Sequence, residues 1–111
     1  MVKVEAVVVR ERVETVIDAV EEETGHVGVT VVEAIGHGHE RGVTHEYRGR
    51  TFESRFLPKA LLTFVVEEAL AERVVAAIAD AARTGYESGD GLCWTCPVAN
   101  VVHHRTAERF G

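Results

Sequence analysis

Apolar and polar residues alternate at the start of the chain, where small apolar residues flank Lys3 and Glu5 before a run of three valines. This period of two predicts a first strand over residues 2–9. Over residues 11–23 the apolar positions instead recur at the i, i+3, i+4, i+7 spacing of one helix face, and Gly25 follows where a helix would end. The pattern therefore predicts a strand followed by a helix.

The same two patterns recur in the rest of the chain. They predict, in order, a strand over 27–35, a polar and glycine-rich stretch over 36–55, a strand over 57–66, a helix over 67–83 and a strand over 92–98. Pro58 stands at the start of its strand, where a missing N–H is tolerated, and Gly85 follows the second helix.

The element order βαββαβ predicts an α+β fold, the ferredoxin-like sandwich of a four-stranded antiparallel sheet with two helices on one face. The strand over 57–66 is apolar on both sides, because Leu61 and Val65 oppose its other apolar residues. Since helices cover only one face, we expect another subunit to cover the second.

Composition narrows the function classes. A chain of 111 residues, 46% hydrophobic and 27% charged, is sized for a single domain, and no apolar run is long enough for a membrane span. Glu5 interrupts the first apolar run, so the layout of a secretory signal is absent and we expect a cytoplasmic protein. The net charge of -6 disfavours nucleic acid as a partner.

The two cysteines, Cys93 and Cys96, are spaced as C-x-x-C within a predicted strand. Residues three apart in a strand point to opposite faces, with Cα atoms roughly 10 Å apart. This spacing is beyond the reach of a disulfide, and the two thiols cannot chelate one metal. Each is interpreted as a small apolar residue beside Trp94. A redox site is the alternative, and it requires the pair to open a helix.

Six histidines raise the question of a metal site. Neither His37-x-His39 nor His103-His104 has the spacing of a closed structural zinc site, so we predict no metal centre. A trimeric metal-binding protein remains an alternative, which equilibrium dialysis with zinc or copper would distinguish.

The segment GHGHERGVTHEYRGRTFESR, residues 36–55, is unusually long for a connection in a compact domain, and such segments are generally functional or disordered. Together with the following FLPK, it resembles the T-loop and next strand of the PII signal-transduction proteins. AARTG followed by GDG resembles their B-loop, and HHRTAER resembles their C-terminal strand. The motifs occur in the family's order over nearly the whole chain.

This resemblance implies a homotrimer whose three intersubunit clefts bind adenine nucleotides (ADP, AMP or ATP). It implies one domain over 1–111, with a T-loop at about 37–56, a B-loop at about 84–91 and a C-terminal segment over 99–111. The T-loop would dock on a membrane transporter or a metabolic enzyme. The resemblance also implies a regulator rather than an enzyme. In agreement, the loop carboxylates form no recognisable acid–base pair.

By position, the resemblance assigns to the nucleotide site Thr30, Gly38, Val65, Gly89, Asp90, Gly91, His103 and Arg105. Glycines around Asp90 would let backbone N–H groups approach phosphate oxygens, and Arg105 would supply a charged fork for the same oxygens. The plainer interpretation is a simple turn and a solvated charge.

Two family positions that hold phosphate-binding cations are occupied here by Leu92 and His103. Leu92 donates no hydrogen bond, and a histidine is mostly neutral near pH 7. The loss of two cations weakens binding of the most highly charged nucleotide most. We therefore expect ADP or AMP to compete with ATP better than in typical members.

The effector site departs from the family as well. The resemblance assigns to it Glu40, Arg41, Gly42 and Lys59. Glu40 replaces a glutamine that contacts a magnesium ion and 2-oxoglutarate, and a carboxylate there repels a dicarboxylic effector unless the metal takes up both charges. With Lys59 retained, we hypothesise a smaller anion, bicarbonate. The alternative is a nitrogen-regulatory member that senses ATP and 2-oxoglutarate with magnesium.

Within the T-loop, Phe52 occupies the position at which some members carry a tyrosine that is nucleotidylated. Without a hydroxyl group, this modification cannot occur there. We interpret Tyr47, Arg48, Gly49 and Phe52 as partner-contacting residues.

Overall fold

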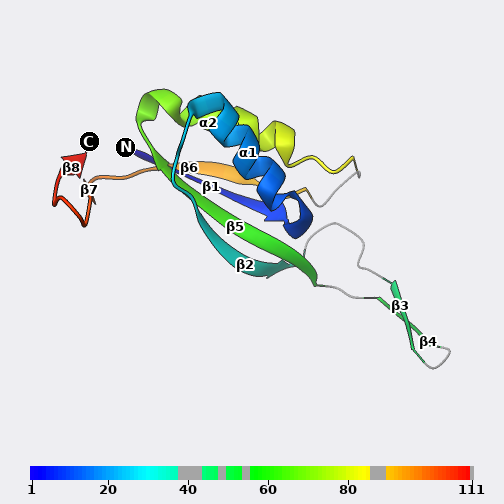
Figure 1. Cartoon of the computed structure of the whole chain (residues 1–111). Coiled ribbons are helices and arrows are strands. Elements are labelled where there is room, and N and C mark those ends of the chain that lie inside the picture. Colours follow the sequence, from blue (N-terminus) through cyan, green and yellow to red (C-terminus); the bar gives the residue numbers. More distant parts are fainter. Residues whose placement is uncertain (38–43, 48–49, 54–55, 86–89, 111) are drawn as a thin grey trace.

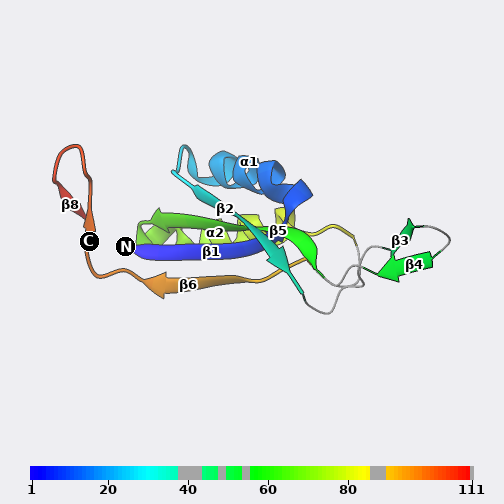
Figure 2. The same cartoon turned by 90° about the horizontal axis from the view of Figure 1, so that it is seen from below.

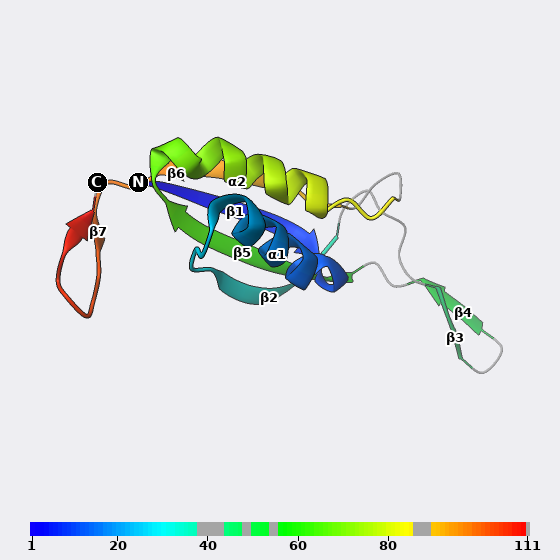
Figure 3. The same ribbon diagram turned by 45° about the horizontal axis from the view of Figure 1, so that its top comes forward.

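Four strands form the main sheet, in the order β2-β5-β1-β6 (Figure 1). The computed structural model describes residues 1–37, 44–47, 50–53, 56–85 and 90–110. The elements are β1 (Val2–Val9), η1 (Arg10–Arg12), α1 (Val13–Thr24), β2 (Thr30–Gly36), β3 (Thr44–Tyr47), β4 (Arg50–Glu53), β5 (Leu57–Val66), α2 (Glu68–Ala81), β6 (Cys93–Pro97), β7 (Val101–Val102) and β8 (Arg109–Phe110). All pairings in the main sheet are antiparallel, and both helices cross one face (Figure 3). The predicted ferredoxin-like α+β fold is confirmed.

The core lies between this face and the helices. β1 pairs with β5 over its full length, from Val2 opposite Val66 to Val9 opposite Lys59. The buried apolar residues of these two strands are all even-numbered: Val4, Ala6, Val8, Ala60, Leu62, Phe64 and Val66. They pack against helix residues that include Val16, Val20, Val74 and Ile78. Burial of each large apolar side chain contributes about 1.5–3 kcal/mol, so this alternation fixes which face the helices cover.

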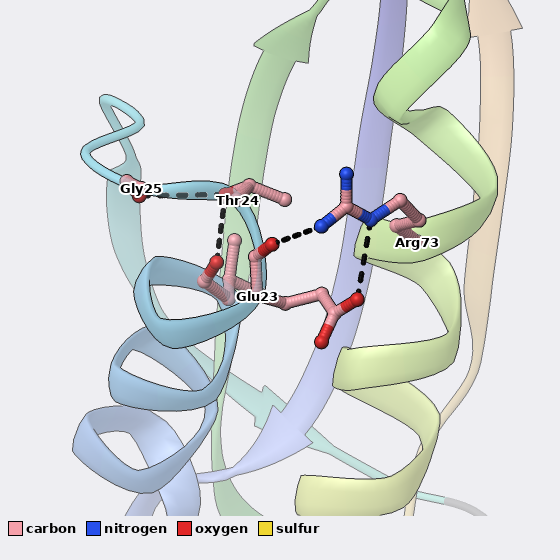
Figure 4. A network of polar contacts seen from close by, with 5 residues as sticks. Glu23, Thr24, Gly25 and Arg73 are labelled. Carbon is pink, nitrogen blue, oxygen red and sulfur yellow. Dashed lines mark hydrogen bonds and ion pairs between the residues drawn. The ribbon is translucent and has the colours of Figure 1, made fainter.

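The C-terminal end of α1 is tied to α2 (Figure 4). α1 ends at Thr24, whose hydroxyl donates to the Val20 carbonyl at 2.7 Å, and Gly25 follows with a φ of 82°. Arg73 of α2 donates to the Glu23 carbonyl at 2.5 Å and to the Glu23 carboxylate at 3.1 Å. The guanidinium of Arg73 thus binds a backbone group that the end of the helix leaves without an intrahelical partner.

The predicted element boundaries differ from the observed ones at several ends. β2 begins at Thr30 rather than at residue 27, because Val27 and Val29 pack against the core while the chain crosses from α1 to the sheet edge. The first predicted helical residues form the separate 3-10 turn η1, and α2 runs over 68–81 rather than 67–83.

Two short hairpins were not predicted. β3 and β4 pair antiparallel within the stretch expected to be irregular, with Tyr47 opposite Arg50. β7 pairs with β8 near the C-terminus. The two chain termini lie close together at one end of the main sheet, whereas β3 and β4 lie beyond the other end (Figure 2).

Candidate functional site at the two ends of the sheet

Gly91 packs against the end of β1. Its φ is 96°, and a Cβ atom at this position would lie 1.7 Å from the carbonyl oxygen of Val7. The Val7 N–H in turn donates to the Leu92 carbonyl at 2.9 Å. Only glycine combines this left-handed conformation with such a close backbone approach. The sequence singled out Gly91 but not Val7, the residue against which it packs.

Asp90 closes the connection that follows α2. Its Oδ1 atom accepts hydrogen bonds from the Thr84 hydroxyl at 2.5 Å and from the Thr84 backbone N–H at 3.3 Å. This carboxylate therefore holds together the two ends of the 84–91 segment. The sequence assigned Asp90 to a ligand, and its contact with Thr84 adds a structural role. Gly89 lies outside the described residues.

Lys59 lies in β5 next to the stem of the 37–56 segment. Only 4% of its surface is exposed, and it is the one buried charged residue among those whose burial is described. A Cβ atom on Gly36 would lie 2.8 Å from the Lys59 Cγ atom, so the aliphatic part of the lysine crosses directly over Gly36. Next to this pair, the rings of His37 and Phe56 are in contact in a tilted arrangement, with a centroid distance of 5.5 Å and an interplanar angle of 48°.

Several predicted residues of this segment cannot be placed. Gly38, Glu40, Arg41, Gly42, Arg48 and Gly49 lie outside the described residues. Tyr47 is the last residue of β3, and Phe52 is paired with His45 in the β3–β4 hairpin.

The remaining predicted nucleotide residues lie at the opposite end of the sheet. Thr30 and Val65 are exposed at the end nearest the chain termini, where Val65 pairs with Lys3. His103 and Arg105 belong to the β7–β8 turn, whose open hollow of about 410 Å³ they line together with Thr106 and Glu108.

The HHRTAER motif is therefore a turn and not the strand that the resemblance implied. The His103 carbonyl accepts from the Ala107 N–H at 2.8 Å, and the His103 N–H donates to the Glu108 carbonyl at 2.9 Å. Ala107 has a φ of 56°, and the Thr106 hydroxyl accepts from the Glu108 N–H at 3.2 Å. These contacts reverse the chain, which an extended motif cannot do.

Strand β6 separates the two groups of residues within one chain. The Leu92 carbonyl binds Val7 at one end of β1, while the Val98 N–H donates to the Met1 carbonyl at the other end. Six steps of extended chain, about 20 Å at 3.3 Å per residue, lie between Leu92 and Val98. Asp90 and Gly91 therefore cannot meet His103 and Arg105 around one small ligand within this protomer.

The face of the sheet without helices carries a polar network among apolar side chains. Glu5 accepts from the Thr63 hydroxyl at 2.9 Å and from the Trp94 indole at 3.3 Å, and it pairs with Lys3 at 3.2 Å. The hydrogen bond from Thr63 is the main cause that lowers the pKa of Glu5, against the opposing effect of partial burial; Lys3 and Trp94 lower it further. A charged residue inside an apolar run was the only sequence signal for this network.

Beside this network lie the apolar residues of the same open face, Val7, Val32, Leu61 and Val65. Val32 is 51% exposed. The open face thus carries the predicted apolar residues, and its covering by another subunit stays a prediction.

The two cysteines lie on opposite faces, as predicted. Cys93 pairs with Ala6 and faces the helices, whereas Cys96 pairs with Lys3 on the open face. Both are free thiols and only half-buried, and burial raises the pKa of the Cys93 thiol. Across the described part of the chain, no group of three His, Cys, Asp or Glu residues could hold a metal ion.

No helix in the described ranges is long and apolar enough to cross a membrane. The four-stranded sheet, the two helices on one face and the long connection between β2 and β5 define a small α+β protein of the ferredoxin-like class.

Comparison with known proteins identifies the family. The sequence model of "Nitrogen regulatory protein P-II" matches residues 1–108. The chain is 41% identical over 111 residues to the nitrogen regulatory protein P-II of Azospirillum brasilense, covering 100% of this chain and 97% of that relative. It is 40% identical over the same length to the protein of that name from Rhodospirillum rubrum, again with 100% and 97% coverage. With the protein of that name from Synechocystis it shares 44% over 85 residues, 77% of this chain and 75% of the relative.

The chain therefore belongs to the P-II family. Members of this family are signal-transducing regulators, so this chain is a regulatory protein and not an enzyme. Membership also implies self-association and binding to target proteins, and adenine nucleotides are the family's general ligands.

Proposed function

We propose that this chain forms a homotrimer that binds adenine nucleotides in three clefts between subunits and reports their identity to a target protein. The observation that carries this proposal is the separation of the predicted nucleotide residues into two groups, about 20 Å apart along β6. One group includes Asp90 and Gly91, and the other includes His103 and Arg105.

A cleft between subunits resolves this separation. If the Gly91 end of one protomer lies against the Arg105 turn of the next, both groups face one ligand, and a closed ring of three protomers forms three such sites. The open face, on which Val32 is exposed and Leu61 is half-buried, supplies an apolar surface for this assembly. Within the cleft, backbone N–H groups near Gly91 and the guanidinium of Arg105 bind phosphate oxygens.

The nucleotide preference follows from two side chains. Leu92 is 76% exposed beside Gly91, where it supplies no charge to a phosphate. His103 lies in the β7–β8 turn and carries a full charge only when protonated. With two fewer permanent cations, the cleft gains little from a third phosphate, so AMP and ADP compete effectively with ATP.

A second, small-anion site lies at the base of the 37–56 segment. Lys59 is buried over Gly36 and supplies the cationic group, while Glu40 disfavours a dicarboxylic ligand. Bicarbonate is the proposed effector, and 2-oxoglutarate with a magnesium ion is the alternative. The β3–β4 hairpin, which contains Tyr47 and Phe52, lies beyond the end of the main sheet (Figure 1). This segment is therefore the surface that docks on the cytoplasmic side of a membrane transporter, or on an enzyme of inorganic-carbon or nitrogen metabolism.

A subunit-mixing experiment tests the shared cleft. We design two variants, Leu92→Glu and Arg105→Glu, each of which places a repelling carboxylate on one exposed half of the site. Titration calorimetry of either variant alone is expected to show ADP binding weakened at least about tenfold, or 1.4 kcal/mol. When the two are co-expressed and assembled at random, about a quarter of the clefts combine two unmodified halves and recover wild-type affinity.

Recovery in the mixed sample establishes that two protomers share each site. If the mixture binds no more ADP than the separate variants, the two groups do not belong to one intersubunit cleft. A wild-type protein that is monomeric by light scattering, or that gives no heat with AMP, ADP or ATP, rejects the proposed function.

A further inference from the structure

The turn η1 at the end of β1 carries two arginines that bind backbone carbonyl groups far away in the sequence. Arg10 Nη2 donates to the Ala34 carbonyl at 2.9 Å and to the Lys59 carbonyl at 3.2 Å, and Arg10 Nε contacts the latter oxygen at 3.4 Å. A single guanidinium thus connects η1 to both β2 and β5.

The two acceptors of Arg10 stand at the stem of the 37–56 segment. Ala34 and Lys59 are direct partners in the β2–β5 pairing, and Gly36 with Leu57, two pairs further towards the segment, is the last pair of this ladder. The planar, five-donor fork of an arginine fixes the positions of both carbonyls relative to η1. Arg10 therefore holds the backbone of Lys59, the residue proposed to bind the anion.

Arg12 makes the corresponding contact on the other side of the turn. Its Nε and Nη2 atoms donate to the Ala81 carbonyl at 3.0 and 2.7 Å. Ala81 is the last residue of α2 and lies three residues before Thr84, whose hydroxyl binds Asp90. The guanidinium of Arg12 binds a carbonyl at the negative end of the helix dipole, where a cation is favoured.

We propose that η1 is a mechanical link between the stems of the two ligand-binding loops, and that Arg10 and Arg12 are its positioning residues. The two arginines stand two residues apart in one 3-10 turn. A shift of the α2 end is transmitted through Arg12 to η1 and then through Arg10 to the pair Ala34 and Lys59. This proposal deepens the proposed function and rests on it for the link's role in signalling, although the link itself is testable without any nucleotide.

Hydrogen exchange of the protein without ligand tests the link. Arg12→Met keeps a long side chain but removes the fork, so exchange of the backbone amides over 81–84 is expected to be about tenfold faster. The link predicts that the same variant also speeds exchange at the distant stem about threefold, at the amides of residues 34–36, 57, 59 and 60, since Pro58 has no N–H. Arg10→Met is expected to produce the reciprocal pattern.

Arg73→Met is the matched control, because Arg73 also binds a backbone carbonyl, that of Glu23, but joins the two helices rather than the loops. Its exchange at both stems is expected to equal that of the wild type. If Arg12→Met changes exchange only over 81–84, and Arg10→Met changes it only at the stem of the 37–56 segment, the proposed link is wrong. Should a methionine variant fail to fold, Arg10→Lys and Arg12→Lys replace it, because lysine keeps the charge without the planar fork. The criterion is the same: exchange must change at the distant stem as well as at the nearby one.

A second arm measures the response to ligand. At saturating ADP, confirmed by calorimetry, exchange at the 57–60 stem of the wild type and of Arg73→Met is expected to slow, whereas in Arg12→Met this slowing is lost. If Arg12→Met responds as the wild type does, the link does not transmit the signal and the proposal is overturned. If the wild type binds no ADP, the proposed function fails, while the exchange pattern without ligand still decides whether the link exists.

Discussion

The carbonyl oxygen of Val7 lies where a Cβ atom on residue 91 would have to be, so that Gly91 is fixed by the end of β1 rather than by its own loop. The separation from the missing Cβ position would be 1.7 Å, and the φ of Gly91 is 96°. Gly85, at the other end of the same loop, has a similar φ of 90° but open space around it. A side chain at residue 85 would therefore meet only the strain of a positive φ, whereas one at residue 91 would also clash with the β1 backbone.

Alanine substitution at these two glycines should give clearly different stabilities. Gly85→Ala introduces only the backbone strain of a non-glycine residue at a positive φ, and it is expected to lower the free energy of unfolding by about 1–2 kcal/mol. Gly91→Ala must also displace the β1 backbone, for a total of about 3–5 kcal/mol. Gly28→Ala, in open space and without a positive φ, serves as the control. Urea unfolding at one protomer concentration measures all three; equal costs at Gly85 and Gly91 would contradict the steric argument.

The hydrogen bonds to Glu5 predict a specific loss of stability in acid. Because the pKa of folded Glu5 lies below its ordinary value, ionised Glu5 stabilises the fold fully above that ordinary value. The contribution declines as pH falls below about 4. Glu5→Gln is expected to flatten this part of the stability profile between pH 7 and 3, whereas Glu22→Gln, exposed on α1, should leave its slope unchanged.

The indole of Trp94 offers a direct readout of the same event. Trp94 is the single tryptophan of the chain, and its Nε1 atom binds Glu5 at 3.3 Å. Protonation of Glu5 removes the negative charge beside the ring, so a shift of the emission maximum is expected at the same acidic pH. A Trp94 emission that changes identically with pH in Glu5→Gln would show that another group causes it.

Hydrophobic patterning predicted the main fold because β1 alternates apolar and polar residues, and because successive apolar residues of β5 point to opposite faces. Leu62 and Phe64 face the helices while Leu61 and Val65 face away, and this separation requires no tertiary information beyond period two. The β3–β4 hairpin was missed because its strands are four residues long and largely polar. The turn at Ala107 was missed because the resemblance implied a strand there, and nothing local signals its positive φ.

The candidate site was only partly predictable for a different reason. Motifs identified Asp90 and Arg105, but their separation depends on the register of β6 against β1, which places Leu92 at Val7 and Val98 at Met1. Likewise, no sequence pattern singled out Arg10 and Arg12. Their acceptors are carbonyl oxygens of residues at distances of 24 to 69 positions along the chain, and side-chain patterns carry no information on such contacts.

A charge on the open face of β2 should prevent assembly, whereas a charge on its helix side should not. Val32 and Val31 are neighbours with exposed fractions of 51% and 43%, but Val32 pairs with Leu61 on the open face and Val31 pairs with Leu62 on the helix side. Val32→Glu would bury an unpaired carboxylate between subunits, which costs several kcal/mol. We expect Val32→Glu to be monomeric and folded, and Val31→Glu to assemble as the wild type does. Light scattering with circular dichroism checks this; assembly of Val32→Glu would place the interface elsewhere.

A cation introduced at Leu92 should shift the nucleotide preference towards ATP. Leu92 is exposed directly after Gly91, so Leu92→Lys adds an ammonium group beside the proposed phosphate position without disturbing the core. ATP carries more negative charge than AMP and gains more from this contact; we expect ATP affinity to rise about tenfold, or 1.4 kcal/mol, and AMP affinity to change less than about threefold. Calorimetry at low and high salt measures both, since screening should reduce the gain. Leu92→Met is the neutral control, and an equal gain for AMP and ATP would mean that residue 92 does not lie beside the terminal phosphates.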